Sequence, residues 1–523
     1  MSTASQFKVT YTSASIDMTE LHRLFDEGLA RVRASLGTNH DLWIDGKPVT
    51  PDTEPLVDTS PIDTSVVLGT FASASADHVD LAVTAARRAQ RGWAARPWQE
   101  RVAVLRRSAE AIRRRKWEIG AVMSLEVGKS RMESMGDAEE SADLIDYYCQ
   151  QVEDADGFVR PLGKLSPNEN TRSVLRPYGV FACIAPYNFP MALSTGMSSA
   201  ALMSGNTVVY KPARDTPWTG MLLRECYAEG GVPDGAFNYL SGTGASMGDA
   251  LWQHPEVDGV VFTGSKEVGL RIVREFSTDW IKPTLMELGG KNPAIVTASA
   301  DLDMAAEGVM KSAFGLQGQK CSACSRVYVD RTVADAFIAK LVERSRAIVV
   351  GDPTRADVYF GPVINGKAVR TFVDGVASAR DGGEVLLGGN RMMEPPFDRG
   401  HFVEPTIVRL PLSHELFFRE LFVPILSVGV VSGLDEAIRE ANKVEYGLTA
   451  GIFSAHREEI DRFFDEVEAG VCYANRRSGA TTGAWPGVQA FCGWKGSGTT
   501  GKGGCGPWYV QQFMREQSRT IME

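Results

Sequence analysis

Short apolar strands alternate with helices from residue 173 onward, and this alternation limits what the chain can fold into. The predicted strands lie at 178–185, 206–212, 237–240 and 257–263, and helical segments fill 191–204 and 217–229. Two neighbouring parallel strands need a crossover connection, which a helix usually supplies. The pattern therefore predicts an α/β fold with a parallel sheet covered by helices, and a second α/β run follows from about 293 to 475.

The segments before and after this alternation have other patterns. An amphipathic helix is predicted over 19–36, and residues 41–70 are typical of short strands interrupted by proline and glycine. Apolar residues at helical spacing predict three further helices, over 76–93, 97–126 and 129–152. A polar segment with glycine and proline, 156–172, separates this helical part from the rest. Near the end of the chain, the apolar run 508–514 predicts an edge strand.

The composition excludes several classes of protein. A chain of 523 residues corresponds to roughly three domains, and 44% hydrophobic with 23% charged residues is typical of a globular protein in water. The formal net charge of −10 argues against nucleic acid as a main partner, because phosphate binding needs a basic surface. The sequence has no run of about 18 apolar residues and no recognisable secretory signal. We therefore expect a cytoplasmic protein that binds neither membranes nor nucleic acids.

The eight cysteines mostly stand singly in apolar surroundings. Cys321 and Cys324 form a C-x-x-C pair, but no second pair or nearby histidine completes a zinc site. The sequence therefore predicts no metal site. Reduced thiols fit the expected cytoplasmic location, because that compartment keeps cysteines reduced.

A carboxylate and a thiol, Glu287 and Cys321, lie 34 residues apart in the most distinctive stretch of the sequence. A covalent reaction that ends in hydrolysis uses these two groups, a soft nucleophile and a base that activates water. Gly289 and Gly290 allow a sharp turn beside Glu287, and Cys321 lies among small polar residues, as a reactive thiol would. Taken singly, each residue has a plainer explanation, a small core cysteine and a solvated glutamate in a turn.

Two glycine-containing segments are candidates for binding a dinucleotide, although the usual G-x-G-x-x-G pattern is absent from the sequence. Residues 242–248 match that pattern with one residue too many before the last glycine. Residues 262–269 follow a predicted strand and open a helix, so the free N–H groups of the helix start can hold a pyrophosphate. An ordinary turn between a strand and a helix explains the same residues.

The segments around the thiol and the carboxylate resemble the aldehyde dehydrogenase superfamily, and the resemblance covers nearly the whole chain. It rests on 286–291 and 318–321, which match the family pattern ELGGK…GQxC. It implies that the Cys321 thiolate attacks an aldehyde and that Asn188, with the backbone N–H of Cys321, stabilises the oxyanion. Glu287 then activates the water that cleaves the thioester, which argues against relatives that pass the acyl group to coenzyme A.

The resemblance also implies an architecture. It predicts a Rossmann-type parallel-sheet cofactor domain from 1–155 and 173–288, and an α/β catalytic domain from 289–498. A small β oligomerisation element would comprise 156–172 and 499–523. In the family, the segment at 156–172 is a β-hairpin that joins subunits, so we expect a homo-oligomer, a dimer or higher.

Two stretches resemble parts of the family's cofactor site. Gly264, Ser265 and Gly269 match the G-S-x-x-x-G loop. The sequence that starts at Glu420 resembles EIFGPV, which implies that Glu420 holds the nicotinamide ribose and that Phe422 packs on the cofactor. The valine after Phe422 replaces the family's glycine, and a core aromatic residue is the alternative for Phe422.

The choice between NAD and NADP depends on residues that follow the strand 206–210. By resemblance, Lys211 contacts the cofactor. Three residues later many NAD-preferring members have a glutamate, whereas this chain has Arg214. A carboxylate would repel a 2′-phosphate and an arginine can pair with one. We expect NAD, with NADP as an alternative, and the adjacent Asp215 could take part of the acidic role.

Three stretches resemble the L-glutamate γ-semialdehyde (1-pyrroline-5-carboxylate) dehydrogenase branch, which acts in proline catabolism: 314–326, 361–365 and 482–489. The carboxylate of that substrate needs donors without bulk, which the N–H groups of Gly483 and Ala484 can supply beside the Ser322 hydroxyl. Phe189 is also assigned to the substrate site. Three alternatives stay open: a flexible loop at 483–484, another aliphatic or aromatic aldehyde, and a non-catalytic dinucleotide-binding protein on the same fold.

Overall fold

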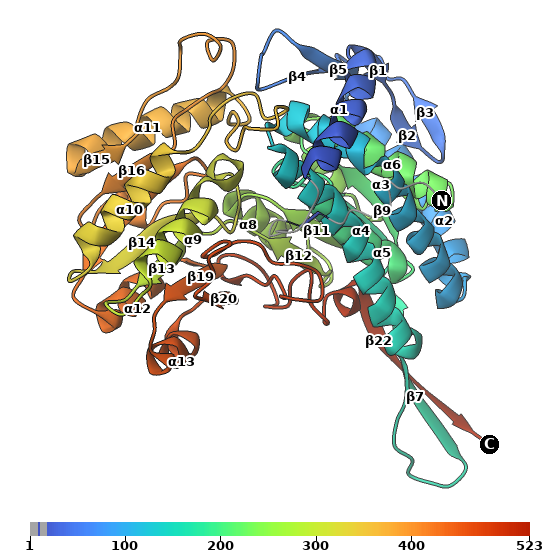
Figure 1. Cartoon of the computed structure of the whole chain (residues 1–523). Coiled ribbons are helices and arrows are strands. Elements are labelled where there is room, and N and C mark those ends of the chain that lie inside the picture. The colour runs from blue at the N-terminus through green and yellow to red at the C-terminus, as the bar shows by residue number, and fades with distance from the viewer. Residues whose placement is uncertain (1–8, 11–17) are drawn as a thin grey trace.

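A mostly parallel seven-stranded sheet forms the centre of one lobe and confirms the predicted α/β fold (Figure 1). The computed structural model describes residues 9–10 and 18–523, so residues 1–8 and 11–17 of the predicted range 1–155 lie outside the described residues. The sheet has the order β12-β11-β8-β9-β10-β2-β3. Its strands are β2 (Leu42–Ile44), β3 (Lys47–Val49), β8 (Val180–Ile184), β9 (Thr207–Lys211), β10 (Phe237–Tyr239), β11 (Gly259–Thr263) and β12 (Thr284–Glu287).

The order of these strands creates a place for a ligand. Strands β8 to β12 are parallel, and β2 with β3 adds an antiparallel hairpin at one edge. The chain runs from β8 through β9 to β10 and then returns to β11 and β12 on the other side of β8. The direction therefore reverses between β8 and β11, and open α/β sheets bind ligands at the carboxyl ends of their strands beside such a reversal.

Helices cover both faces of this sheet, which is why its strands are apolar on both sides. In β9, Val208 and Tyr210 face one core and Val209 faces the other. On one face, α5 (Ala192–Met203) and α6 (Pro217–Gly230) pack against the strands, and α3 (Trp98–Val127) and α4 (Arg131–Asp154) pack on these two helices. Helix α1 (Met18–Ala34) packs on α3 and completes the same hydrophobic core. The other face of the sheet packs against α2 (Ala76–Ala95), α7 (Asp249–Trp252) and α8 (Lys266–Glu275). The predicted helices over 19–36, 76–93, 97–126 and 129–152 are thus confirmed.

Local chemistry explains where these helices begin and end. Helix α6 has Pro217 in its first turn, where a missing N–H costs nothing, and the next N–H groups donate to the buried carboxylate of Glu126 at 2.7 and 3.1 Å. Helix α3 ends at Gly128, which has a φ of 82°. A Cβ there would lie 2.8 Å from the Pro362 carbonyl oxygen, so the position requires glycine.

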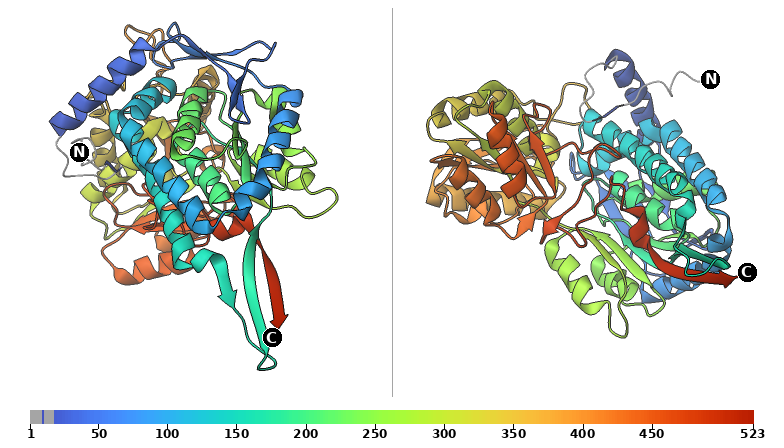
Figure 2. Two further views of the ribbon diagram at one scale, coloured as in Figure 1. Left: turned by 90° about the vertical axis from the view of Figure 1, so that its right-hand side faces the viewer. Right: turned by 90° about the horizontal axis from the view of Figure 1, so that it is seen from below.

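A second seven-stranded sheet forms the other lobe, and Figure 2 shows the two lobes side by side. Its order is β15-β16-β17-β14-β13-β19-β20, and β15 is its antiparallel member. The strands are β13 (Asn292–Val296), β14 (Cys324–Asp330), β15 (Glu384–Leu387), β16 (Thr406–Arg409), β17 (Ile425–Val431), β19 (Thr449–Phe453) and β20 (Val471–Ala474). The covering helices are α9 (Leu302–Phe314), α10 (Ala334–Arg346), α11 (Gly366–Gly382), α12 (Leu434–Asn442) and α13 (Arg457–Glu466).

Smaller elements complete the lobes. Strands β1 (Thr38–His40), β5 (Val67–Phe71) and β4 (Leu56–Thr59) form a three-stranded sheet. Strands β18 (Tyr446–Gly447) and β21 (Trp494–Lys495) pair with each other. The single-turn helices are η2 (Asp156–Phe158), η3 (Gly244–Gly248), η4 (Gly315–Gly318), η5 (Glu415–Phe417) and η6 (Val510–Phe513).

A three-stranded sheet protrudes from the first lobe and corrects one prediction. It joins β6 (Val159–Pro161), β7 (Glu169–Pro177) and the C-terminal β22 (Met514–Met522). The edge strand predicted at 508–514 is wrong, because most of that run forms η6 and the strand begins at Met514. The apolar residues of the run anchor it in the core, where Tyr509 packs on Tyr148 and Phe513 packs on Phe181. The polar residues that follow form the strand by backbone pairing with β7.

Candidate active site

The carboxyl edge of the first sheet carries several of the predicted site residues. Lys211 is the last residue of β9 and Glu287 is the last residue of β12. Asn188 lies in the turn after β8, and Ser265 follows β11. Because parallel strands end at the same edge, residues far apart in the sequence converge here, beside the reversal in strand order.

A four-residue connection, 288–291, joins this edge to the amino edge of the second sheet. It leads from β12 into β13, and β13 pairs with β14, which begins just after Cys321. The Asn292 amide donates to the carbonyl oxygens of Cys321 and Ala323 at 2.6 and 3.0 Å and so fixes the turn that carries the thiol. At Gly290, a Cβ would lie 2.4 Å from the Cys321 carbonyl oxygen, so only glycine permits this close approach.

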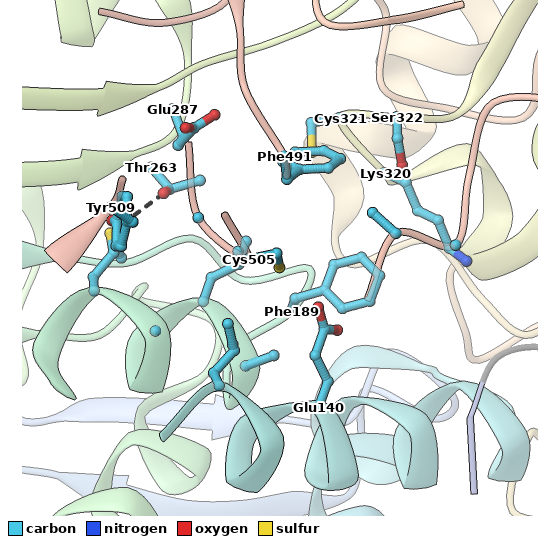
Figure 3. Close-up of a pocket in the computed structure, with 18 of the residues that line it drawn as sticks. Glu140, Phe189, Thr263, Glu287, Lys320, Cys321, Ser322, Phe491, Cys505 and Tyr509 are labelled. Atoms are coloured by element: carbon cyan, nitrogen blue, oxygen red, sulfur yellow. Dashed lines mark hydrogen bonds between the residues drawn. The ribbon is translucent and has the colours of Figure 1, made fainter. Parts of the chain in front are cut away.

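One apolar cavity between the lobes receives the thiol and the carboxylate (Figure 3). Cys321 and Glu287 both line it, together with the residues predicted for the substrate: Phe189, Ser322, Gly483 and Ala484. Asn188 is 3% exposed and precedes Phe189, but it does not itself line this cavity. The structure thus brings together all but one of the residues predicted for the catalytic and substrate sites.

Burial sets the protonation of the two reactive groups. Burial, together with charge repulsion from Glu287 and Glu420, raises the pKa of the Cys321 thiol to about 12. Burial also raises the pKa of Glu287 well above its usual value. One oxygen of this carboxyl, Oε2, makes no hydrogen bond to any residue that the structure describes. The resting site therefore holds a neutral thiol beside a carboxyl group that is free to receive a proton.

Sequence reasoning missed other residues of the cavity. They come from α4, from the carboxyl end of β11 and from segments on either side of the predicted motifs: Glu140, Thr263, Lys320, Phe491, Cys505 and Tyr509. Lys320 was detectable as the neighbour of Cys321, and its ammonium group pairs with Glu133 at 2.5 Å. No sequence pattern identified Glu140. A glutamate on a long helix is usually exposed to solvent, and only the packing of α4 against the cavity shows that this one lines it.

The loop predicted to bind the cofactor lies at the start of α8. The Ser265 hydroxyl caps this helix by accepting from Val268 N at 3.4 Å. A Cβ at Gly264 would lie 2.5 Å from the Phe262 ring, and one at Gly269 would lie 2.4 Å from the Leu288 side chain. Gly269 therefore lets α8 pack close to the end of β12, and Gly264 fits the turn beside Phe262 of β11, where its N–H donates to Glu287 O at 3.1 Å. The free N–H groups at the start of α8 lie at the carboxyl edge of the sheet.

Lys211 and Arg214 occupy different environments after β9. Lys211 is buried, its ammonium group donates to Pro212 O at 3.2 Å, and burial lowers its pKa to about 8. Arg214 is exposed in the turn that follows. Asp215 accepts from the Asn365 amide at 3.3 Å, and burial raises its pKa. Arg214 can therefore reach toward a ligand above the sheet edge, whereas Asp215 is held in place.

Glu420 and Phe422 lie at the junction of the lobes. The Glu420 carboxylate accepts from Gly290 N at 2.8 Å, and burial raises its pKa to about 7. Phe422 has a φ of 60°, an uncommon backbone conformation that occurs often at functional sites. Its ring meets Tyr187 edge-to-face at 6.0 Å and is half-buried, so it is not a core residue. The positive φ falls at Phe422, so the valine that replaces the family's glycine at 423 does not need glycine's conformational freedom.

These features fit a dinucleotide: a helix start with free N–H groups, a buried lysine at the sheet edge, and a glutamate with an aromatic ring between the lobes. A sequence model described as the aldehyde dehydrogenase family matches residues 49–518. The chain belongs to the aldehyde dehydrogenase family. This aldehyde dehydrogenase is 34% identical over 507 residues to the 1-pyrroline-5-carboxylate dehydrogenase of Geobacillus sp. (strain WCH70), covering 96% of each chain.

Two further comparisons point to the same group of enzymes. The 1-pyrroline-5-carboxylate dehydrogenase 2 of Bacillus subtilis (strain 168) is 36% identical over 506 residues, covering 95% of this aldehyde dehydrogenase and 96% of the relative. The crystal structure of 1-pyrroline-5-carboxylate dehydrogenase from Thermus with bound NAD superposes with a TM-score of 0.93 at 34% identity, covering 98% of each chain.

The described residues offer neither a cluster of metal ligands nor a membrane-spanning helix. No group of three or more histidine, cysteine, aspartate or glutamate side chains is arranged to hold a metal ion among residues 9–10 and 18–523. Within the same residues, no helix has both the length and the apolar character that crossing a membrane requires.

Proposed function

We propose that this aldehyde dehydrogenase oxidises L-glutamate γ-semialdehyde to L-glutamate with NAD, as the names of its relatives indicate. One observation carries the substrate assignment. The N–H groups of Gly483 and Ala484 adjoin the cavity that holds Cys321, and neither donates in the hydrogen bonds of the described residues. Two unpaired donors on residues that line an apolar cavity suit a carboxylate carried by the substrate.

The first half of the reaction depends on Cys321 and Asn188. The Cys321 thiol passes its proton to solvent water, and the resulting thiolate attacks the aldehyde carbon and forms a tetrahedral adduct. The amide of Asn188 and the N–H of Cys321 would then donate to the oxygen as its negative charge develops. A bound nicotinamide would supply the acceptor for the hydride that leaves this carbon, and Cys321 would then carry the acyl group as a thioester.

The second half depends on Glu287. Its carboxylate removes a proton from water, the water oxygen attacks the thioester carbon, and the Cys321 thiol is released with the carboxylate product. A raised pKa makes Glu287 a stronger base than an exposed glutamate, and its unpaired Oε2 is available to the water. The presence of nucleophile and base in one cavity argues against a non-catalytic protein on this fold.

The proposed substrate carries an α-carboxylate and an α-ammonium group, so its binding site needs both hydrogen-bond donors and a negative charge. Glu140 lines the cavity and its carboxylate suits the α-ammonium group, while Ser322 beside the nucleophile adds a hydroxyl donor. Phe189 and Phe491 line the cavity as well and would pack on the methylene groups between the two ends. We propose this division of roles for the substrate residues.

Wild-type kinetics test the substrate assignment. We expect kcat/KM for the semialdehyde, generated in solution from 1-pyrroline-5-carboxylate, to exceed that for propanal or benzaldehyde by at least about tenfold, equivalent to about 1.4 kcal/mol. NADH absorbance with each aldehyde measures the rates. A preference for unsubstituted or aromatic aldehydes would show that the cavity serves another substrate.

Replacement of Ala484 by leucine should separate the two classes of substrate. Ala484 is 9% exposed, and a leucine there would cover the N–H groups that we assign to the carboxylate. We expect KM for the semialdehyde to rise by about tenfold or more, while kcat/KM for propanal changes less than about threefold. Propanal serves as the internal control for folding, and equal losses on both substrates would remove the loop from carboxylate binding.

Arg214 tests the choice of cofactor. Arg214→Glu should lower the ratio of kcat/KM with NADP to that with NAD by about tenfold, because a carboxylate repels the 2′-phosphate. Arg91→Glu is a matched control: Arg91 is exposed on α2, where the neighbouring Gln90 contacts Gly205 before β9, at the opposite edge of the sheet. An unchanged ratio in Arg214→Glu would show that Arg214 does not face the adenosine ribose.

We also propose that the protein is a cytoplasmic homo-oligomer and keep the predicted division into domains. The sheet of β6, β7 and β22 supports a contact between subunits, because β22 is almost wholly exposed along its nine residues. An exposed edge strand offers unpaired backbone groups to another chain. All eight cysteines are free thiols, as in a reducing compartment.

A further inference from the structure

The guanidinium group of Arg476 lies behind the loop that we assign to the substrate carboxylate. Its Nη1 donates to Thr482 O at 2.9 Å and its Nη2 donates to Gly483 O at 2.7 Å. Two consecutive carbonyl groups of the chain are therefore held by one planar side chain. Such a forked contact fixes direction as well as distance, which a single hydrogen bond does not.

The geometry of the peptide unit converts this contact into an orientation of N–H groups. In a planar trans peptide, the C=O and N–H bonds point in opposite directions. The Thr482 carbonyl belongs to the same unit as the Gly483 N–H, and the Gly483 carbonyl belongs to the same unit as the Ala484 N–H. With both oxygens turned toward Arg476, both N–H groups turn away from it, and Gly483 and Ala484 line the cavity whereas Arg476 does not.

The surroundings of Arg476 hold this arrangement in place. The guanidinium lies 4.6 Å from the centroid of the Tyr473 ring, in a cation–π contact. Gly483 has a φ of 92°, and a Cβ there would lie 3.0 Å from the Arg476 Nη2. Glycine therefore allows both the backbone conformation and the close approach of the arginine.

We infer that Arg476 is a positioning residue for substrate recognition: it aims the N–H groups of Gly483 and Ala484 at the α-carboxylate of the amino-acid aldehyde. This inference rests on the proposed function. The positive charge on the oxygen side of both peptide units also polarises them, which strengthens their N–H groups as donors to an anion. Arg476 itself does not line the cavity and does not touch the substrate.

The test replaces Arg476 by methionine, which retains an unbranched stem and removes the charge and both donors. We expect KM for L-glutamate γ-semialdehyde to rise about 30-fold with kcat nearly unchanged, because the carboxylate is bound equally before and during the chemical step. Both parameters for propanal should stay within about twofold, because propanal has no carboxylate. Arg476→Lys should recover part of the loss, because one ammonium group can reach one of the two carbonyls.

Arg477→Met is the matched control. Arg477 is the next residue, is exposed, and pairs with Glu307 on the surface at 2.9 Å. Its replacement should leave KM for both substrates unchanged. A second readout is independent of turnover: calorimetric titration of the purified enzyme with L-glutamate should show a dissociation constant about 30-fold higher for Arg476→Met than for the wild type.

The outcomes separate this inference from the proposed function. If the wild type prefers the semialdehyde and binds L-glutamate, but Arg476→Met retains the same KM and the same affinity, the inference is wrong and the function stands. If Arg476→Met loses propanal activity as well, Arg476 supports the fold and not the carboxylate subsite, which also overturns the inference. A wild type that neither prefers the semialdehyde nor binds L-glutamate contradicts the proposed function.

Discussion

Cys321→Ala should lower the rate of aldehyde oxidation by at least about a thousandfold while NAD binds with an affinity within about twofold of the wild type. The thiol forms the bond that holds the substrate carbon during oxidation, and alanine provides no nucleophile. The cavity should otherwise keep its shape, because the side chain of Cys321 is small and the Asn292 contacts that fix its turn reach the backbone carbonyl.

The second cysteine of the C-x-x-C pair provides the control. The Cys324 thiol is buried and donates to Arg326 O at 3.5 Å, away from the cavity that holds Glu287. Cys324→Ala should therefore retain activity within about threefold of the wild type. Steady-state formation of NADH measures both variants, and fluorescence titration measures NAD binding. Turnover of Cys321→Ala above about a thousandth of the wild-type rate would count against the nucleophile assignment.

Glu287→Gln should uncouple the two halves of the reaction. Glutamine matches the size of glutamate but cannot accept a proton from water, so hydrolysis of the thioester should slow by about a hundredfold or more. Oxidation does not need this base once the thiolate has formed. We therefore expect a rapid burst of one NADH per active site, followed by slow turnover, and mass spectrometry should detect the acyl group on Cys321.

The raised pKa of Glu287 predicts how the rate of hydrolysis changes with pH. Burial raises the pKa of Glu287, so lowering the pH protonates it in a range where an exposed glutamate is still ionised. Hydrolysis in the wild type should therefore slow as the pH falls through the raised pKa, and this dependence should be absent from Glu287→Gln. A steady-state rate of the variant equal to that of the wild type, with no burst, would remove Glu287 from the mechanism.

The sequence by itself determined the class of fold and the reacting groups. Apolar strands separated by helices pack in few ways, so the alternation alone predicted a parallel sheet covered by helices. Cys321 and Glu287 were recognisable because the segments that carry them resemble the aldehyde dehydrogenase family, whereas each residue taken singly has a plainer explanation. The requirement for glycine at Gly290 is different, because it comes from the close approach to the Cys321 carbonyl, which is a tertiary contact.

The tertiary structure decided what depends on residues that meet only after folding. The apolar run that predicted a strand at 508–514 instead anchors the segment in the core, because its aromatic rings pack on Tyr148 and Phe181. Burial, which no sequence pattern measures, raised the pKa of both Cys321 and Glu287.

At the proposed carboxylate subsite, too, the sequence indicated some residues and the tertiary structure revealed others. The sequence pointed to Gly483 and Ala484 as small residues whose N–H groups a ligand could reach. It did not indicate Arg476, because the sequence does not distinguish an arginine that faces solvent from one that contacts the loop six residues later. The direction of a hydrogen bond is a property of three-dimensional arrangement, and the two contacts of Arg476 with the loop carbonyls decide which way those N–H groups point.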